Sequence, residues 1–242
     1  MGAPVFHFKQ FSVEHDKCAM KVGTDGVLLG AWSPLPSTSS CARVLDIGVG
    51  SGLIALMIAQ RLRQEAQEFT IYGIDIDPDA VKQSLINFQQ SPWAGHLTSQ
   101  HCTLQQYQVD EPFDLIVSNP PYFQNSLKNP NNARATARHT DSLPYNELLD
   151  HASRLLGQNG ILALILPAEA EKEILLLAQE HHLSPTHITY VHSKPGKSAK
   201  RILLAFTNTT TYVPFITEHF YVESENSPRS DEYQQVTQEF YL

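Results

Sequence analysis

The sequence predicts an α/β fold with a seven-stranded, mostly parallel sheet that includes a terminal antiparallel strand. Three observations support this prediction. From residue 43 onward, short apolar runs alternate with longer helical patterns, which is typical of βα units on a parallel sheet. A glycine-rich turn directly follows the first apolar run. The last two apolar runs are joined by a short polar turn, which indicates a hairpin.

The strands are read from the apolar runs, in chain order. Five runs alternate with helical patterns, so we expect five parallel strands with crossover helices between them. The two final runs, on either side of the polar turn 193–198, are expected to pair with each other. The predicted strands are 43–47, 70–74, 97–102, 113–117 and 161–166, followed by the pair 187–192 and 201–207.

The helices are read from apolar periodicity and capping residues. Asp77 can cap a helix that has Pro78 at its first position, where a missing N–H costs nothing. In that helix Val81, Leu85 and Phe88 follow at spacings of four and three, which gives one core-facing stripe. The other predicted helices are 53–62, 146–156 (ending at Gly157) and 169–181.

Composition limits the class of protein. The chain has 242 residues, 42% of them hydrophobic, with no internal repeat, so we expect one domain over 1–242 with a segment 1–42 ahead of the sheet. A net charge of -8 argues against a broad electrostatic grip on nucleic acid. The three scattered cysteines form no metal-type pair and suit a reducing cytoplasm. No apolar stretch approaches the roughly 20 residues that span a bilayer. We therefore expect a cytoplasmic protein with no membrane contact and no metal.

A glycine-rich turn at 46–52 links the first predicted strand to the first helix. Such a turn folds sharply and lets a ligand approach its backbone, which favours residues without a Cβ. Gly48, Gly50 and Gly52 are therefore candidate cofactor-binding residues. Their alternate spacing, with Leu at 53, differs from the dinucleotide-binding pattern.

Two acidic residues narrow the class of cofactor. Asp46 opens the glycine-rich turn, where its charge would repel a pyrophosphate but attract a cationic ligand. S-adenosylmethionine carries an ammonium and a sulfonium and no phosphate, so Asp46 favours it as the cofactor. Asp75 ends the second strand, where a carboxylate accepts hydrogen bonds from the ribose hydroxyls of an adenosine cofactor. The nearby Asp77 is already explained as a helix cap.

The fourth predicted strand leads directly into Asn119, Pro120, Pro121 and Tyr122. Consecutive prolines fix φ and remove two backbone donors, so the loop is stiff. It lies at the carboxyl end of a core strand, beside the glycine-rich turn. An ordinary turn would need neither the asparagine nor the aromatic residue, so we interpret this segment as a catalytic loop.

The chemistry that fits this loop is methylation of an adenine amino group. The Asn119 side-chain oxygen and the Pro120 carbonyl oxygen can accept hydrogen bonds from the two N–H groups and stabilise the charge that develops on the nitrogen. Tyr122 can stack on a flipped-out base. The methylated nitrogen becomes strongly acidic, so no strong general base is needed. The candidate catalytic residues are Asn119, Pro120 and Tyr122, and Pro121, Tyr122 and Phe123 are candidate substrate contacts.

The residues at 46–52, Asp75 and 119–122 match, in the same order, the amino-group methyltransferases of the Rossmann-like superfamily. That group methylates adenine in DNA or RNA, and also glutamine in peptide release factors, whose planar amide presents similar N–H geometry. Release-factor enzymes carry a separate helical domain ahead of the sheet, whereas only 42 residues precede Arg43 here. The acidic residue that such enzymes offer to the cofactor adenine is replaced by His101-Cys102-Thr103, so contact there is expected through the backbone or the Thr103 hydroxyl.

The rest of the chain resembles the bacterial valine-tRNA adenine-N6 methyltransferase family. The resemblance is carried by residues 8–11, 15–16, 20–32, 201–206 and 240–242. It implies a Rossmann-like S-adenosylmethionine methyltransferase fold and N6-methylation of the adenosine 3′ of the anticodon of a valine tRNA. It also implies that segment 1–42 packs over the cofactor site, with Lys21, Thr24 and Asp25 in its wall and Asn119 beside the cofactor. The alternatives are an rRNA, DNA adenine or protein glutamine acceptor, and a non-catalytic module that binds the cofactor or RNA.

Two basic clusters offer contacts for RNA phosphates. One lies on the turn between the last two predicted strands, and the other lies after the catalytic loop. Few phosphate contacts suit a small structured target such as an anticodon loop. We expect a monomer whose partner is tRNA, with Arg138, Lys197 and Lys200 as substrate contacts. The clusters are Lys194, Lys197, Lys200 and Arg201, and Lys128, Arg134, Arg138 and His139.

Overall fold

The computed structural model describes residues 5–18, 20–37, 40–121, 143–209 and 213–242. Within these residues one large sheet has eight strands in the order β10-β8-β9-β7-β6-β3-β4-β5, and β1 and β2 form a separate pair. The strands are β1 (Val5–His7), β2 (Ser12–Glu14), β3 (Ala42–Ile47), β4 (Phe69–Asp75), β5 (Leu97–His101), β6 (Phe113–Ser118), β7 (Leu156–Pro167), β8 (Ser184–His192), β9 (Ala199–Thr207) and β10 (Ile216–Tyr221).

The predicted α/β fold is confirmed, with one more strand than expected. The five predicted parallel strands are β3 to β7, and β8 and β9 form the predicted antiparallel pair. Strand β9 also pairs antiparallel with β7, so it is inserted between β7 and β8. The eighth strand, β10, pairs parallel with β8 at the sheet edge. Its sequence Ile-Thr-Glu-His-Phe-Tyr mixes polar and apolar residues and is mostly exposed. It therefore contains no continuous apolar run from which a strand could be predicted.

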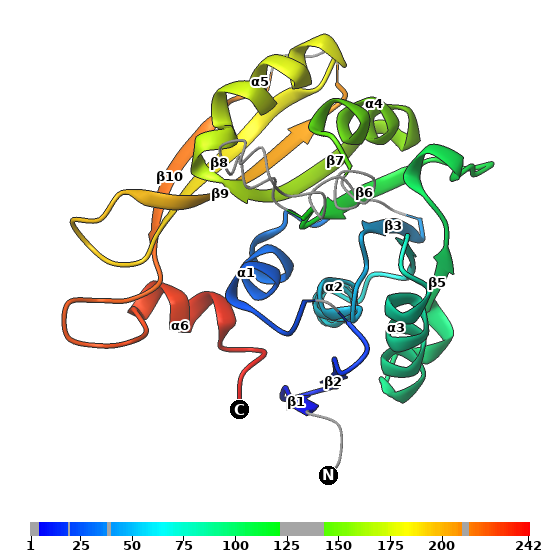
Figure 1. Cartoon of the computed structure of the whole chain (residues 1–242), viewed down its shortest axis with the longest axis horizontal. Coiled ribbons are helices and arrows are strands. Elements are labelled where there is room, and N and C mark those ends of the chain that lie inside the picture. Colours follow the sequence, from blue (N-terminus) through cyan, green and yellow to red (C-terminus); the bar gives the residue numbers. More distant parts are fainter. Residues whose placement is uncertain (1–4, 19, 38–39, 122–142, 210–212) are drawn as a thin grey trace, which may run out of the picture.

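Helices cover both faces of the sheet (Figure 1). The helices α1, α2, α3 and α6 lie on one side, and α4 and α5 lie on the other. This three-layer arrangement buries the apolar residues of the central strands on both faces. The helices are α1 (Thr24–Trp32), α2 (Leu53–Gln64), α3 (Pro78–Gln90), α4 (Tyr145–Leu155), α5 (Glu171–Glu180) and α6 (Asp231–Thr237), with short 3-10 turns at η1 (Ala94–His96), η2 (Leu104–Gln106) and η4 (Ala168–Ala170).

Local signals placed α3 correctly. The Asp77 side chain accepts a hydrogen bond from the Asp79 backbone N–H at 2.9 Å, and Pro78 is the first helical residue. The predicted helix end at Gly157 was wrong, because α4 ends at Leu155 and β7 begins at Leu156 without an intervening loop. The pairing of β7 with β6 then shifts register before Ile161 pairs with Leu115. The apolar run 161–166 therefore predicted only the part of β7 that follows this shift.

The order of the strands creates a switch point at the centre of the sheet. From β3 the chain moves outward through β4 and β5, then crosses back to β6 on the other side of β3. Ile47 and Ser118, the last residues of β3 and β6, are neighbours in register. Connections leave in opposite directions here, so a crevice forms outside these carboxyl ends, where α/β proteins bind ligands.

The segment before the sheet is tied to the turn after β3 by one buried side chain. Asn87 of α3 is fully buried. Its Oδ1 accepts from the Glu14 N–H at 3.0 Å, and its Nδ2 donates to the carbonyls of Glu14 and Ser51, each at 2.8 Å. The link therefore joins β2, α3 and the glycine-rich turn. No helix in the described part of the chain is long and apolar enough to cross a membrane.

The Asn87→Leu variant is expected to lose about 2–4 kcal/mol of unfolding free energy, because it leaves the backbone groups of Glu14 and Ser51 buried without partners. Urea denaturation measures this loss, with the exposed Gln89→Leu on the same helix as the matched control. Equal stability of the two variants would show that the link contributes nothing.

Candidate active site

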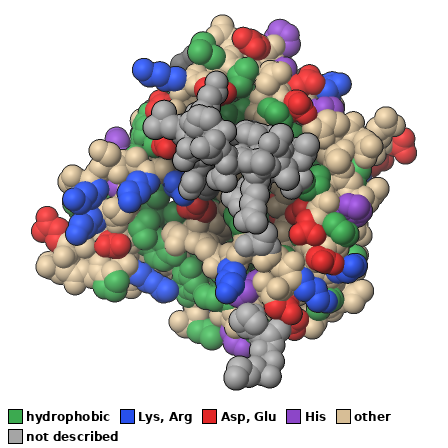
Figure 2. All heavy atoms as spheres, viewed as in Figure 1, with side chains coloured by type: hydrophobic (Ala, Val, Ile, Leu, Met, Phe, Trp, Pro, Cys, Tyr) green, Lys and Arg blue, Asp and Glu red, His purple; other side chains and the backbone are tan. Residues whose placement is uncertain are grey.

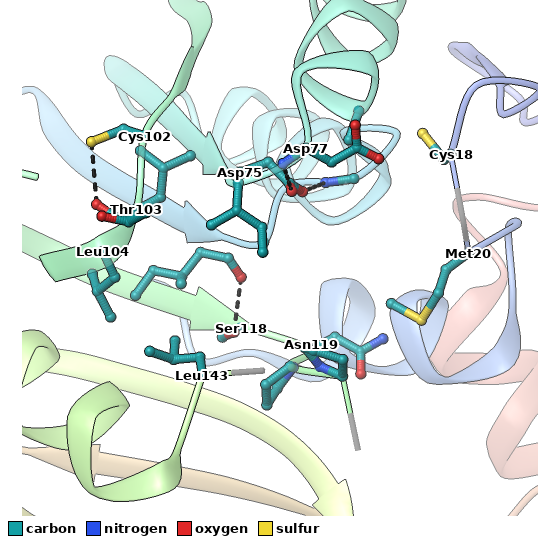
Figure 3. Close-up of a pocket in the computed structure, with 18 of the residues that line it drawn as sticks. Cys18, Met20, Asp75, Asp77, Cys102, Thr103, Leu104, Ser118, Asn119 and Leu143 are labelled. Carbon is teal, nitrogen blue, oxygen red and sulfur yellow. Dashed lines mark hydrogen bonds between the residues drawn. The ribbon is translucent and has the colours of Figure 1, made fainter. Parts of the chain in front are cut away.

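A cavity of about 380 Å³ opens at the carboxyl ends of β3, β4 and β6, at the switch point of the sheet. Its volume is in the range of small-molecule and cofactor sites. Figure 3 shows Asp75 on one wall and Asn119 on another, with Cys18 and Met20 approaching from the N-terminal segment. The walls are formed by Cys18, Met20, Ile47, Gly48, Gly50, Ile74, Asp75, Ile76, Asp77, Ala80, Cys102, Thr103, Leu104, Gln105, Ser118, Asn119, Pro120, Pro121 and Leu143.

The glycine-rich turn is held open toward this cavity. Gly48 and Gly50 have φ values of 75° and 52°, in the left-handed region that favours glycine. The Gly48 and Val49 amides both donate to the Ile74 carbonyl, at 2.9 and 3.0 Å. A Cβ built on Gly48 would meet no atom within 4 Å, so the side-chain position is open space on the cavity wall. A ligand can therefore lie directly against this backbone.

Gly52 has a different role from the other two glycines. Its φ is 80°, but a Cβ there would lie 2.5 Å from Cε1 of the buried Phe88. Gly52 is not among the residues that line the cavity. The structure therefore places this predicted cofactor residue at a close contact between the turn and α3.

Asp75 organises the cavity wall through both of its oxygens. Its Oδ2 accepts from the Gly50 N–H and its Oδ1 accepts from the Asp77 N–H, each at 2.9 Å (Figure 3). The carboxylate thus fixes the glycine-rich turn on one side and the start of α3 on the other. Each oxygen retains a further lone pair, so the same carboxylate can also accept hydrogen bonds from a bound ligand.

Asp46 lies beneath the turn and is completely buried. Among the described residues, neither of its oxygens has a hydrogen-bond partner of normal length and angle. Burial raises the pKa of Asp46 from 3.8 to about 7; the backbone N–H of Ala55 offsets part of this rise and the charge of Asp75 adds to it. A buried acidic group at this position favours a positive charge in the neighbouring cavity.

The Asp46→Asn variant is expected to stabilise the ligand-free protein at pH 8 but not at pH 4. The raised pKa means that the folded protein keeps a proton that the unfolded chain releases between pH 4 and 7. The unfolding free energy of the parent protein therefore falls as pH rises through that window. The expected gain at pH 8 is on the order of 2–4 kcal/mol. Thermal melts of both proteins at the two pH values measure it, and a pH-independent difference would contradict it.

The end of β5 contributes the far wall of the cavity. Cys102 and Thr103 line it, as do Leu104 and Ile76. The Cys102 thiol donates to the Thr103 carbonyl at 3.2 Å, and Ile76 is 48% exposed although apolar. Ile76 and Leu104 give this wall apolar contacts that suit a planar ring. Ile76 follows Asp75 directly in the sequence, and this position next to a predicted cofactor residue could have identified Ile76 as part of the cavity wall.

The Asn-Pro-Pro loop follows β6 and faces the glycine-rich turn. The Ser118 hydroxyl donates to the Ile47 carbonyl at 2.8 Å, which ties the ends of β6 and β3 together. Asn119, Pro120 and Pro121 all line the cavity. The structure thus brings three predicted site residues next to Gly48, Gly50 and Asp75. Tyr122, Phe123 and Arg138, together with Lys128, Arg134 and His139, lie outside the described residues.

The N-terminal segment reaches the cavity through residues that sequence reasoning did not name. Cys18 and Met20 line it, whereas Lys21 and Thr24 do not. Burial, with the charges of Asp75, Asp77 and Asp16, raises the pKa of the Cys18 thiol to about 11, so it is a neutral wall group. Met20 belongs to the stretch 20–32 that carries the family resemblance, and it directly precedes Lys21, which was one of the residues predicted to lie in the wall.

The basic cluster on the β8–β9 turn divides into two kinds of residue. Arg201 donates from Nε to Asp25 at 2.9 Å, which joins β9 to the start of α1. Lys194, Lys197 and Lys200 are exposed and make no salt bridge within the described part of the chain. No group of three or more His, Cys, Asp or Glu side chains placed to hold a metal occurs among the residues described.

Residues 32–184 match the methyltransferase small domain family. The chain belongs to this family. Curated relatives of this methyltransferase carry the name tRNA1(Val) (adenine(37)-N6)-methyltransferase. The protein from Phocaeicola vulgatus is 43% identical over 242 residues, covering 100% of this chain and 99% of its own. The protein from Aeromonas salmonicida is 45% identical over 239 residues, covering 98% and 97%.

Solved structures show the same fold at low sequence identity. A predicted O-methyltransferase from Agrobacterium tumefaciens has a TM-score of 0.68 and 16% identity, covering 89% of this methyltransferase and 96% of its own chain. A putative RNA methyltransferase from Pyrococcus horikoshii has a TM-score of 0.52 and 15% identity, covering 71% and 75%. Family membership and this fold together imply S-adenosylmethionine as the methyl donor.

Proposed function

We propose that this methyltransferase transfers a methyl group to N6 of an adenosine in tRNA. One observation carries the proposal: the Asn119-Pro120 acceptors and the Gly48–Asp75 cofactor walls share a single cavity. The relatives named for adenine-37 N6-methylation in valine tRNA align over nearly the whole of this chain. The proposed acceptor is accordingly the adenosine 3′ of the anticodon of a valine tRNA, in the cytoplasm.

The residues of the cavity fit S-adenosylmethionine, which supplies an electrophilic methyl group when bound. Gly48 and Gly50 present an open backbone surface for its amino acid part. The Asp75 carboxylate is proposed to accept hydrogen bonds from the ribose hydroxyls, and the wall at Ile76 and Cys102 is proposed to contact the adenine. Burial raises the pKa of Asp46 beneath the turn to about 7, and an ammonium group bound in the cavity would favour its ionised form. Lys21 and Thr24 remain proposed cofactor contacts, although neither lines the cavity.

The chemical work of the chain is to hold and polarise the acceptor amine. The proposed acceptors, the Asn119 amide oxygen and the Pro120 carbonyl oxygen, accept hydrogen bonds from the two amine N–H groups. This raises electron density on the nitrogen and stabilises the positive charge that develops on it. The consecutive prolines keep these acceptors in place because they restrict the backbone. The extra proton leaves to water, since the methylated nitrogen is strongly acidic.

Further contacts to the RNA are proposed for the aromatic residues after the Asn-Pro-Pro loop and for three basic residues. Tyr122 is proposed to stack on the extruded base, with Pro121 and Phe123 beside it. Arg138, Lys197 and Lys200 are proposed to contact phosphates. Of these three residues, the two lysines are exposed, and they lie at the same edge of the sheet as the cavity.

A comparison of purified acceptors tests the proposed function. The protein is incubated with methyl-labelled S-adenosylmethionine and, separately, with tRNA, rRNA, duplex DNA or a peptide release factor. We expect label in tRNA alone, located in N6-methyladenosine after digestion. Label in the release factor or in DNA would assign the same loop to a different acceptor, and label in no acceptor would overturn the proposal.

The affinity for tRNA is expected to fall with salt, but with a shallow slope, because few lysines face the RNA on a protein of net charge -8. Fluorescence anisotropy of labelled tRNA between 50 and ~300 mM salt measures the slope, which approximates the number of neutralised phosphates. A dissociation constant that does not change with salt would exclude the proposed lysine contacts.

A further inference from the structure

Four aromatic side chains form one surface at the edge of the large sheet, here called the histidine–tyrosine face: Tyr190 and His192 of β8, and His219 and Tyr221 of β10. In the parallel β8–β10 pair, His219 is opposite Tyr190 and Tyr221 is opposite His192. Side chains alternate along a strand, so all four rings emerge on one side.

The four rings are packed in a continuous series. Tyr190 and His219 stack with ring centroids 5.2 Å apart at 22°, and His192 and Tyr221 stack at 4.9 Å and 24°. The two histidine rings between them are 5.1 Å apart. The rings therefore support one another, and among the described residues His219 is exposed while the other three are half-exposed.

Hydrogen bonds hold the rings in fixed orientations. The Lys197 carbonyl can only accept, so Nδ1 of His192 donates to it, at 2.7 Å. The other nitrogen of His192, Nε2, lies 2.9 Å from Nδ1 of His219. The Tyr190 hydroxyl donates to Glu171 at 2.8 Å. Rings fixed in this way lose little conformational entropy when a ligand stacks on them.

The same hydrogen bond places basic charge beside the face. His192 holds the turn 193–198 through the Lys197 carbonyl. Lys194, Lys197 and Lys200 on this turn and on β9 are exposed. Figure 2, drawn from the same side as Figure 1, shows basic side chains gathered at the left, where Figure 1 places the β8–β9 turn.

The face lies at the same edge of the sheet as the active-site cavity. His192 and Tyr221 are the last residues of β8 and β10, and both strands run in the same direction as β6, which ends beside Asn119. β8 lies three strands from β6 and β10 lies four. At about 4.8 Å per strand, the face begins about 15–20 Å from the catalytic loop.

We propose that the histidine–tyrosine face binds unpaired nucleotides of the substrate RNA a few positions from the target adenosine, by stacking bases on His219 and Tyr221 while the turn lysines contact phosphates. Exposed rings on a sheet surface bordered by lysines are a common arrangement for single-stranded RNA. This inference rests on the proposed function, because it extends the substrate of the same active site.

The test measures tRNA binding by fluorescence anisotropy with the full-length protein, independently of methyl transfer. His219→Thr and Tyr221→Thr remove the rings but keep a residue that favours strands. We expect each to raise the dissociation constant for tRNA about tenfold, in the range of a lost base stack. His219→Phe and Tyr221→Phe, which keep a ring, are expected to bind within about twofold of the parent protein.

Two matched controls separate this surface from a general loss of folding or charge. His187→Thr changes a histidine of β8 that pairs with Glu218 and packs against Trp32, on the opposite face of the strand, and is expected to keep its tRNA affinity. Lys197→Ala removes one lysine of the turn and is expected to weaken tRNA binding, whereas Lys172→Ala on α5 is its charge-matched control and is expected to keep the affinity of the parent protein. Unchanged tRNA affinity in His219→Thr and Tyr221→Thr, with melting temperatures like that of the parent protein, would overturn the inference.

The readout also separates the inference from the proposed function. If the parent protein binds tRNA through these rings but adds label only to another RNA, the proposed tRNA substrate fails and the face stands. If the parent protein methylates tRNA and the threonine variants match it in both affinity and KM, the proposed function stands and the face does not. Absence of RNA binding by the parent protein would overturn the inference as well.

Discussion

Asn119→Ala is expected to lower kcat for methyl transfer by at least about 10³-fold, while the dissociation constant for S-adenosylhomocysteine changes by less than about threefold. Removing one preorganised hydrogen-bond partner of a developing charge costs about 10²–10³ in rate. In this cavity the lost oxygen is one of only two proposed acceptors for the amine. We therefore expect the loss of rate to lie at the upper end of that range or beyond it. Single-turnover methylation and calorimetry measure the two quantities separately.

Asn208→Ala is the matched control for this variant. Asn208 follows β9, which runs antiparallel to β7, so it lies at the opposite edge of the sheet, where it donates to the Leu156 carbonyl. It is expected to keep full activity. If Asn119→Ala instead retained its rate and lost cofactor affinity, Asn119 would belong to the cofactor site and not to the reacting amine.

Asp75→Ala is expected to weaken cofactor binding by at least about 100-fold. The variant loses the carboxylate that accepts from the Gly50 and Asp77 amides, so the glycine-rich turn is no longer held against α3. It also loses the proposed acceptor of the ribose hydroxyls. Charge-assisted hydrogen bonds contribute about 1.5–3 kcal/mol each, so the loss of two or more accounts for the size of the effect. Calorimetric titration with S-adenosylhomocysteine measures it.

Two companion variants sharpen the interpretation of Asp75→Ala. Asp75→Asn keeps one oxygen acceptor and is expected to bind with intermediate affinity. Asp77→Ala removes the cap of α3, whose hydrogen bond to Asp79 is exposed, and is expected to lower stability slightly with little effect on the cofactor. Equal losses of affinity at Asp75 and Asp77 would show that the fold of the turn matters and the ribose contact does not.

Local features of this chain could be predicted well from sequence. The α3 start depends on Asp77 and Pro78, which act on their own neighbours. The glycine-rich turn and the Asn-Pro-Pro loop each follow a strongly apolar strand, and parallel strands end at a common edge. Their meeting in one cavity therefore follows from the strand order that βα units favour.

Features that depend on distant partners could not be predicted. α1 is almost entirely buried and carries Gly30 against Met57 of α2, so its sequence shows no polar face from which a helix could be recognised. The pairing of Arg201 with Asp25 spans 176 residues, and a basic cluster alone does not reveal it. Likewise the close approach of Gly52 to Phe88 is set by how α3 packs, not by the turn itself.

The most direct test of the central claim is mass spectrometry of nucleosides from purified valine tRNA, taken from cells with and without an intact gene for this chain. We expect N6-methyladenosine next to the anticodon in the tRNA of the parent cells, its loss in cells without the gene, and its return with the parent protein but not with Asn119→Ala. An unchanged level of N6-methyladenosine in that tRNA after loss of the gene would contradict the assignment.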